Sequence, residues 1–266
     1  MLNTEWQLSG NIAERYEEFL VPVIFVPWAR DLLARAALNP NMQLLDLACG
    51  TGIVARMASA SGVTATGGDI NAAMLAVAEQ HADGTKLSFR HADAQALPFH
   101  DQTFDAVICQ QGLQFFPDRR TAAMECLRVL KPGGRAIFCT ARGLSENPLM
   151  QAQAAAFSQY FGDGAAAPIR AVCSFADADE TESLFADAGF SSVRVNKVVL
   201  DLFAGDAVGF VDGMMKATPV ADKIGALDSA TRQQLRSTIL DEFGACFDGS
   251  SLRFPHSANV AVVFRP

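Results

Sequence analysis

Residues 44–52 read Leu44-Leu45-Asp46-Leu47-Ala48-Cys49-Gly50-Thr51-Gly52, an apolar run that contains one acid and leads into a glycine turn. Glycine allows the backbone to turn tightly and to approach a ligand closely. The residues that follow are expected to form a helix, whose N-terminus would offer free backbone N–H groups. The segment therefore predicts a strand, a turn and a helix that together bind a polar ligand.

Two classes of cofactor fit this turn. The run from Gly50 to Ala55 satisfies the G-x-G-x-x-G/A pattern of dinucleotide binding. A carboxylate at Asp46 that faced the turn would repel a pyrophosphate, but it would attract an ammonium or sulfonium group. Asp46 therefore favours a positively charged cofactor. In the alternative interpretation, Asp46 and the glycines only cap a helix.

A second acid follows the next predicted strand. Asp69 comes directly after Gly67 and Gly68, where a carboxylate can accept hydrogen bonds from both hydroxyls of a ribose. Asn71 is expected to cap the next helix, on which Met74 can lie against an adenine face. Taken alone, an acid in a turn before a core methionine would be the simpler reading.

A third acid lies at the end of the third predicted strand. Asp93 can accept a hydrogen bond from an adenine amino group there, while the Ala94 N–H donates to the ring. Open α/β sheets bind ligands at the carboxyl ends of their strands. Three acids at three successive strand ends therefore predict one binding site.

The chain alternates strand-like apolar runs with helix-like segments, which predicts a parallel sheet covered on both faces. The expected strands are residues 44–47, 63–66, 87–90, 106–110, 136–140, 193–202 and 259–264. Helices are expected at residues 11–38, 148–161 and 177–188, with two more within 206–247. Residues 162–168 are expected to form a mobile connection.

The segments that flank the predicted sheet supply an apolar acceptor site in our interpretation. The first helix carries an apolar face and is a candidate lid, in which Tyr16 and Trp28 would close over cofactor or substrate. The long excursion between the last two strands contains Met214 and Met215, and 19 phenylalanines occur in the chain. These features predict an apolar cavity, although most of the phenylalanines belong to the core in either case.

The motifs together resemble those of the class I S-adenosylmethionine-dependent methyltransferases, particularly the small-molecule branch similar to the ubiquinone and menaquinone C-methyltransferases. The resemblance runs from about Met42 to Thr140, and its last motif is Leu130-Lys131-Pro132-Gly133-Gly134. It implies an α/β, Rossmann-like, doubly wound seven-stranded sheet, mostly parallel with an antiparallel last strand, plus a helical cap. The expected division is a single domain, 1–266, with a cap at 1–40, a cofactor-binding core at 41–142, and substrate-side helices with the last two strands at 143–266.

The resemblance implies S-adenosyl-L-methionine as the cofactor and places it by residue. Ala48, Gly50 and Gly52 would line its methionine and ribose, Asp69 would hold its hydroxyls, and Asp93 with Ala94 its adenine. Gln110 and Leu113 would lie beneath the methionine part. The full set of expected cofactor-binding residues is Tyr16, Asp46, Ala48, Cys49, Gly50, Thr51, Gly52, Asp69, Ile70, Met74, Asp93, Ala94, Gln110 and Leu113.

The chain departs from the family pattern at two positions. Ala48 replaces the commoner first glycine, and Gln114 stands where many relatives have a histidine. The second change casts doubt on a base at that position. His100 and His256 are the candidate catalytic residues, because family loops in those regions border the acceptor pocket. No metal-binding group of residues is expected.

Composition narrows the class of partner. The net charge is −8, with 21 basic and 29 acidic residues, so a small-molecule substrate is expected and nucleic acid is not. No apolar run reaches the length of about 20 residues that crosses a bilayer, and residues 1–6 do not read as a signal peptide. Six scattered cysteines agree with free thiols, and the cytoplasm is the expected compartment.

Two other functions fit the same motifs. A methyltransferase fold can bind the cofactor without methylating, as a cyclase or a binding module, and fold alone does not exclude this. An NAD(P)-linked oxidoreductase is disfavoured by Asp46 and by the later motifs. The acceptor atom, whether oxygen, carbon or nitrogen, is left open by the sequence.

Overall fold

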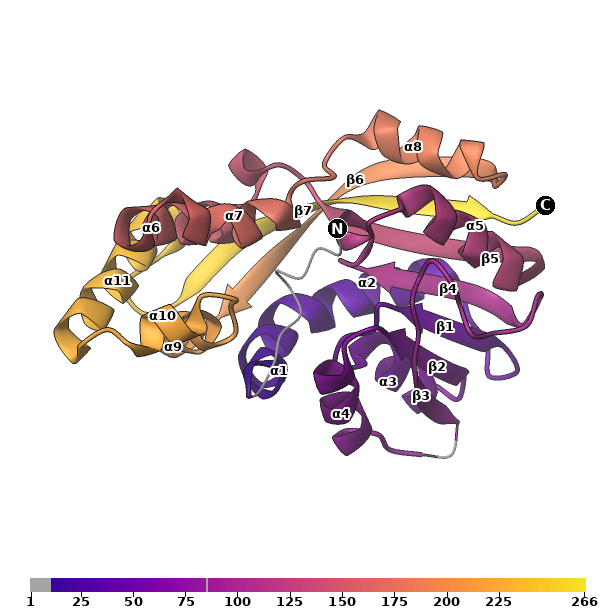
Figure 1. The fold of residues 1–266 in the computed structure, drawn as a ribbon, viewed down its shortest axis with the longest axis horizontal. Helices are drawn as coiled ribbons and strands as arrows, with labels where there is room; N and C mark the ends of the chain where they lie inside the picture. The colour runs from indigo at the N-terminus through magenta and orange to yellow at the C-terminus, as the bar shows by residue number, and fades with distance from the viewer. Residues whose placement is uncertain (1–10, 85) are drawn as a thin grey trace.

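The computed structural model describes residues 11–84 and 86–266 and contains a seven-stranded sheet with helices on both faces (Figure 1). The strands lie in the order β3-β2-β1-β4-β5-β7-β6, and β7 runs antiparallel to both of its neighbours. This arrangement confirms the predicted fold class. The strands are β1 (Gln43–Leu47), β2 (Thr64–Asp69), β3 (Leu87–His91), β4 (Phe104–Gln110), β5 (Leu130–Ala141), β6 (Ser191–Ala204) and β7 (Leu252–Phe264).

Alternating side chains of the central strands pack into two separate cores, as expected for a sheet buried on both faces. Leu44 and Ile108 pack in one core with α2 and α3, whereas Leu45 and Val107 pack in the other with α5 and α8. The helices are α1 (Ile12–Arg15), α2 (Val26–Ala36), α3 (Ile53–Ala60), α4 (Ala72–Gln80), α5 (Arg119–Val129), α6 (Pro148–Phe161), α7 (Asp163–Val172), α8 (Ala178–Asp187), α9 (Ala207–Lys216), α10 (Ala221–Gly225) and α11 (Ser229–Glu242).

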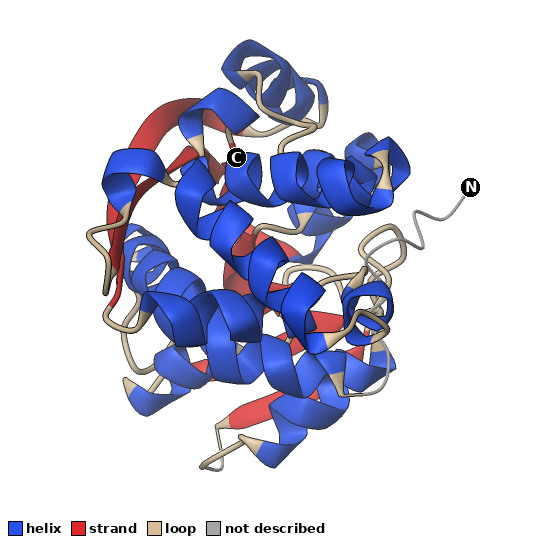
Figure 2. Ribbon diagram, turned by 90° about the vertical axis from the view of Figure 1, so that its left-hand side faces the viewer, coloured by secondary structure: helices blue, strands red, loops and turns tan. Residues whose placement is uncertain are grey.

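Strands β6 and β7 continue beyond the rest of the sheet. The pairing of β7 with β5 stops at Ala258, whereas its pairing with β6 continues to Leu252. Helices α6, α7, α9, α10 and α11 gather around this extension at the left of Figure 1, and they face the viewer in Figure 2. Phe254 of the extension packs against Phe210 and Phe243, with ring centroids 6.2 and 5.5 Å apart. The extension therefore forms the base of a second helical layer. Below, "the cap helices" are α6, α7, α9, α10 and α11, which are distinct from the cap expected at residues 1–40.

The helix predicted at residues 11–38 is helical from 12 to 36, but its middle is a π-helix, η2 (Tyr16–Phe25), between α1 and α2. The Val26 N–H donates to the Val21 carbonyl, five residues earlier. Pro22 lies inside η2 and Pro27 at the start of α2, and neither has a backbone N–H to donate. Residues 1–10 of the expected cap, including those read for a signal peptide, lie outside the described residues.

Two expectations about the cap region were wrong. Residues 162–168 belong largely to helix α7, which begins directly after Gly162; the alanines at 165–167 are strong helix formers and outweigh the flanking glycines. Residues 206–247 contain three α-helices instead of two, because α9 ends just before Pro219 and Asp228 caps a new helix by accepting from the Thr231 N–H. Within the described part of the chain, no helix combines the length and apolarity needed to cross a membrane.

Candidate functional site

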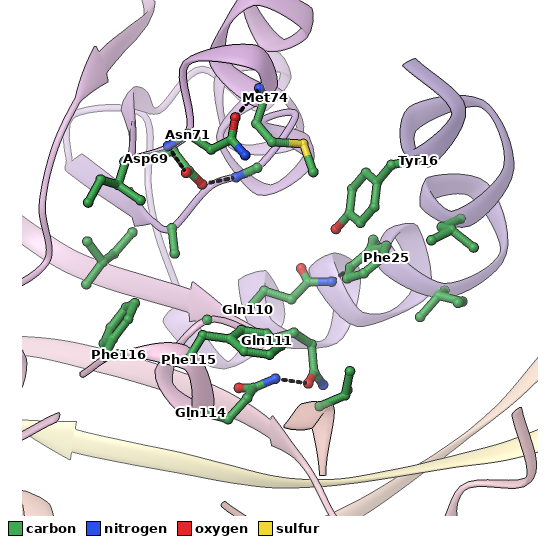
Figure 3. Close-up of a pocket in the computed structure, with 18 of the residues that line it drawn as sticks. Tyr16, Phe25, Asp69, Asn71, Met74, Gln110, Gln111, Gln114, Phe115 and Phe116 are labelled. Atoms are coloured by element: carbon green, nitrogen blue, oxygen red, sulfur yellow. Dashed lines mark hydrogen bonds between the residues drawn. The ribbon is translucent and has the colours of Figure 1, made fainter. Parts of the chain in front are cut away.

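A cavity lies between the carboxyl ends of β1 to β4 and the helices of the cap (Figure 3). Its lining has two chemically different parts. The acidic wall comes from the end of β2, from helix α4 and from the loops after the strands, and its residues are Ala48, Gly50, Asp69, Ile70, Asn71, Met74, Asp93 and Ala94. The apolar wall comes mainly from η2 and the cap helices, and its residues include Leu20, Ile24, Leu149, Met150, Ile169, Val172 and Met214.

The turn after β1 holds the backbone close to the cavity. Ala48 and Gly50 both adopt positive φ angles, of 53° and 54°. A Cβ atom at Gly50 would lie 3.9 Å from the Tyr16 hydroxyl, so a side chain there would take up space in the cavity. The Gly50 N–H donates to Asp69 Oδ2 at 2.7 Å, which fixes the turn to the end of β2.

Asp69 is the most strongly held acid of the acidic wall. In addition to the Gly50 N–H, its carboxylate accepts from the Asn71 N–H at 2.8 Å through Oδ1 (Figure 3). Burial raises the pKa of Asp69, and the backbone hydrogen bonds from Asn71 and Gly50 oppose that shift. The carboxylate is therefore fixed in one orientation at the cavity edge.

The remainder of the acidic wall suits a flat, weakly polar group. Asp93 lines the cavity, and its Oδ1 accepts from the Gln95 N–H at 2.9 Å. Asn71 caps α4 through hydrogen bonds from the Ala73 and Met74 N–H groups, as the sequence predicts. The Met74 side chain thereby lies beside Asp69 and points toward Tyr16 (Figure 3).

Tyr16 brings a hydroxyl to the cavity from the first residue of η2. Its ring packs against Phe25, with the ring centroids 4.8 Å apart. Burial, followed by the charges of Asp69 and Glu17, raises the pKa of Tyr16 well above its ordinary value. The hydroxyl therefore stays protonated at neutral pH and can donate a hydrogen bond.

Two glutamines, one at the end of β4 and one in the short helix that follows, have side-chain carbonyl oxygens without a partner among the described residues. Gln110 Nε2 donates to the Phe25 carbonyl at 3.0 Å, and Gln114 Nε2 donates to Gln111 Oε1 at 3.1 Å (Figure 3). The Oε1 atoms of Gln110 and Gln114 are buried and accept from no described residue. Because buried acceptors normally find a donor, these atoms indicate that a ligand supplies one.

His256 lines the same cavity from the β6–β7 extension and is 1% exposed. Its Nδ1 accepts from Trp28 Nε1 at 3.0 Å. Burial lowers the pKa of His256 to about 4, so the imidazole is neutral at pH 7. Trp28 is fully buried and does not line the cavity. It contacts the His256 imidazole and does not close over a ligand, although this was expected of it.

Several expected site residues do not line the cavity. The residues outside the lining are Asp46, Cys49, Thr51, Gly52, Leu113 and His100. Gly52 is needed for packing, since a Cβ there would lie 2.5 Å from the Phe89 ring. His100 is exposed in the loop before β4, and this position does not fit a base beside the acceptor.

Asp46 differs most from its expected placement. It is 1% exposed, and its Oδ2 accepts from the Ala55 N–H at 2.9 Å, in the first turn of α3. Burial raises the pKa of Asp46 to about 8, although the Ala55 hydrogen bond opposes the shift. The carboxyl is therefore largely neutral at pH 7 and caps a helix, which was the alternative interpretation of this residue.

Several lining residues were not expected from the sequence. Gln111, Phe115, Phe116 and Gln153 line the cavity, but they lie in a loop, a short 3-10 helix and a cap helix. Gln111 has a positive φ of 58° directly after β4. The pattern of apolar residues in the sequence does not predict this backbone conformation. The only available signal was their position after β4, where ligand-binding loops occur in α/β sheets.

Comparisons with known proteins agree with this geometry. The methyltransferase domain family matches residues 45–138. A ubiquinone/menaquinone biosynthesis C-methyltransferase, UbiE, of Desulfotalea psychrophila is 33% identical over 190 residues, which cover 70% of this chain and 72% of that protein. The chain spans about half the length of other curated relatives, 46% for an uncharacterised protein of Mycobacterium tuberculosis.

Solved structures share the fold at low sequence identity. The phosphoethanolamine N-methyltransferase 2 of Haemonchus contortus, solved with phosphomonomethylethanolamine and S-adenosylhomocysteine, superposes with a TM-score of 0.62 at 19% identity, over 96% of this chain and 57% of that chain. The [4+2]-cyclase SpnF superposes with a TM-score of 0.57 at 19% identity, over 91% and 81%. The fold, the motifs and the extent of the UbiE match together show that this chain belongs to the class I S-adenosylmethionine-dependent methyltransferases and is similar to the ubiquinone/menaquinone C-methyltransferases.

Proposed function

We propose that the protein transfers the methyl group of S-adenosylmethionine to a small, largely apolar molecule. One observation carries this proposal: a single cavity joins an acidic wall that suits an adenosyl group to an apolar wall that suits an organic acceptor. Residues 41–142 would hold the cofactor, while residues 1–40 and 143–266 would supply the acceptor side.

The residues of the cavity fit the cofactor in its individual parts. Asp69 would accept from the ribose hydroxyls, Asp93 from the adenine amino group, and Met74 would pack on the adenine. The buried, unpaired Oε1 of Gln110 would accept from the ammonium of the methionine part. The space that a side chain at Gly50 would fill is left to the ligand.

When bound, S-adenosylmethionine would supply a methyl group that is already activated by its positively charged sulfur. Transfer of that methyl group to the acceptor leaves S-adenosylhomocysteine, a thioether. The protein's contribution is then to hold the acceptor in line and to exclude water, for which a buried apolar wall is suited. Tyr16 and His256 are poor bases, because the first keeps its proton and the second has a lowered pKa. This favours an acceptor that loses its proton easily, such as a phenol or a quinol.

Reduced quinones are the first acceptors to test. The relative matched over 72% of its length is a ubiquinone/menaquinone C-methyltransferase by name, and a quinol combines an apolar body with acidic hydroxyls. The proposed finer activity is methylation of a ring carbon of such a quinol. The deprotonated quinol would form the new bond to carbon as the methyl–sulfur bond breaks, and the proton of that ring carbon would move to a ring oxygen, which restores the aromatic ring.

Mass spectrometry of reaction products tests the proposal. The purified protein is incubated with S-adenosylmethionine and a short-chain demethylmenaquinol under reducing conditions, and methylated product and S-adenosylhomocysteine should appear together. The Asp69→Ala variant should lose both. If S-adenosylmethionine stays bound and unchanged while the acceptor is altered without gaining a methyl group, the chain uses its fold in a non-methylating reaction and the proposal is wrong.

A further inference from the structure

Part of the hydrogen-bonding capacity of the cavity is unused, and what this implies for the acceptor rests on the proposed function. Among the described residues, three buried side-chain atoms of the lining have no hydrogen-bond partner: Gln110 Oε1, Gln114 Oε1 and His256 Nε2. The two glutamine atoms are acceptors. The character of His256 Nε2 depends on its protonation.

The contact with Trp28 determines that protonation. An indole N–H can only donate, so the nitrogen that receives it, Nδ1 at 3.0 Å, carries no proton. The imidazole is neutral at pH 7, because burial lowers the pKa of His256 to about 4 and no charged group contributes to that shift. A neutral imidazole carries its single proton on the other nitrogen, which is Nε2.

Other polar groups near the apolar wall are already engaged. The Gln153 amide donates to the Met214 sulfur, and the Thr218 hydroxyl donates to the Met215 carbonyl at 3.1 Å. His256 Nε2 is therefore a buried donor without a partner in the described chain. A buried donor left unpaired is costly, so a ligand that satisfies it gains affinity over one that does not.

We propose that His256 is a specificity-determining hydrogen-bond donor, which selects acceptor molecules bearing an oxygen lone pair, such as a ring carbonyl or hydroxyl, within an apolar body. Trp28 is its positioning residue and fixes the Nε2–H tautomer. This assignment replaces the role of general base that the sequence suggested for His256.

The tautomer can be measured directly and without any turnover. In protein labelled with 15N-histidine, long-range 1H–15N correlation spectra at pH 7 distinguish Nε2–H, Nδ1–H and imidazolium forms. The His256 signal is assigned by its absence from the His256→Gln variant, because the chain has four histidines, and we expect it to show the pure Nε2–H form. The Trp28→Phe variant, which keeps an aromatic ring but no donor, should show a tautomer mixture. An Nδ1–H form or an imidazolium at pH 7 would overturn the proposal, and a pure Nε2–H form in Trp28→Phe would remove the role of Trp28.

Selectivity is measured with a matched pair of probes, 1-tetralone and tetralin, which share a carbon skeleton but differ in one carbonyl oxygen. We expect 1-tetralone to bind about tenfold more tightly to the wild-type protein and to shift the His256 Nε2 resonance. His256→Ala should abolish the preference, and His256→Gln, whose amide can donate, should restore part of it. Equal binding of the two probes to the wild type, or an unchanged preference in His256→Ala, would contradict the proposal.

The two proposals fail separately. The spectra and the probe pair are recorded with and without S-adenosylhomocysteine, and neither requires methyl transfer. If no acceptor is ever methylated, the oxygen preference still tests His256. If methylation occurs with equal tetralone and tetralin binding, the proposed function holds and this inference falls.

Discussion

At the scale of single residues, the acids of the acidic wall should differ in their effect on cofactor binding. In the proposed complex, Asp69 would accept from two ribose hydroxyls, whereas Asp93 would accept from one amino group. Because charge-assisted hydrogen bonds are each worth about 1.5–3 kcal/mol, Asp69→Ala should weaken S-adenosylhomocysteine binding by on the order of 100-fold and Asp93→Ala by about tenfold. Isothermal titration calorimetry measures both.

The thermal stability of each variant without ligand serves as the control for this comparison. Asp69 also accepts from the Gly50 and Asn71 N–H groups, so its replacement disturbs the turn itself. Equal losses of affinity in the two variants would show that the carboxylates do not divide the work as proposed.

Strand register decides which of the predicted strand-end acids reaches the cavity. Asp69 is the last residue of β2, so its side chain reaches the ligand-binding edge of the sheet. Asp46 of β1 pairs with Gly67 of β2, which lies two residues before Asp69. Asp46 therefore lies further inside the sheet than Asp69. A sequence pattern that marks both as strand-end acids cannot resolve this difference, because it depends on how the two strands are aligned.

At the scale of secondary-structure elements, the contact between η2 and α9 depends on a glycine. A Cβ at Gly213 would lie 2.0 Å from the Phe19 ring, so no larger residue fits without displacing one helix. We expect Gly213→Ala to destabilise the protein by about 1–3 kcal/mol, although alanine itself favours a helix. Chemical denaturation measures the change.

Gly225→Ala is the matched control, since Gly225 also lies in a helix and a Cβ there would meet no atom within 4 Å. That variant should be as stable as the wild type or slightly more so. Equal stability of the two variants would mean that η2 and α9 can move apart at little cost.

The elements that sequence periodicity missed are those whose form depends on neighbours. The π-helical middle of residues 12–36 cannot be distinguished from an α-helix by an apolar face. The last strand was expected to begin at residue 259, but β7 begins at Leu252. Pro255 is tolerated in the strand because β7 pairs only with β6 at this residue, so one side of β7 needs no backbone N–H donor there. His256, which was expected just before the last strand, therefore lies within it.

At the scale of the whole molecule, two buried groups give opposite slopes to stability against pH. The pKa of Asp46 is raised to about 8, so its stabilising contribution is complete below about pH 4 and is lost as the pH rises toward 8. The pKa of His256 is lowered to about 4, so stability is lost as the pH falls from about 6.5 toward 4. Between about pH 4 and 6.5 the contributions of Asp46 and His256 to the pH dependence of stability cancel each other. From about pH 6.5 to 8 only the contribution of Asp46 remains, and these two groups together then lower the free energy of unfolding as the pH rises.

Asp46→Asn tests the alkaline part of this profile. Asparagine keeps an oxygen that can accept from the Ala55 N–H but cannot ionise. Between about pH 6.5 and 8, the free energy of unfolding of the wild type should fall relative to the variant by roughly 1 kcal/mol per pH unit. Urea denaturation of both proteins at several pH values measures this, and parallel curves would show that Asp46 does not ionise in this range.

The helices α9, α10 and α11 leave the sheet at the end of β6 and return at the start of β7, where Ala204 and Leu252 are paired. Their entry and exit points are therefore adjacent, and the strands that hold the acidic wall do not pass through them. A different set of helices could therefore be introduced at this junction by protein engineering without changing the strands that carry the acidic wall. The fold thus permits new acceptor ranges to arise by exchange of one contiguous segment.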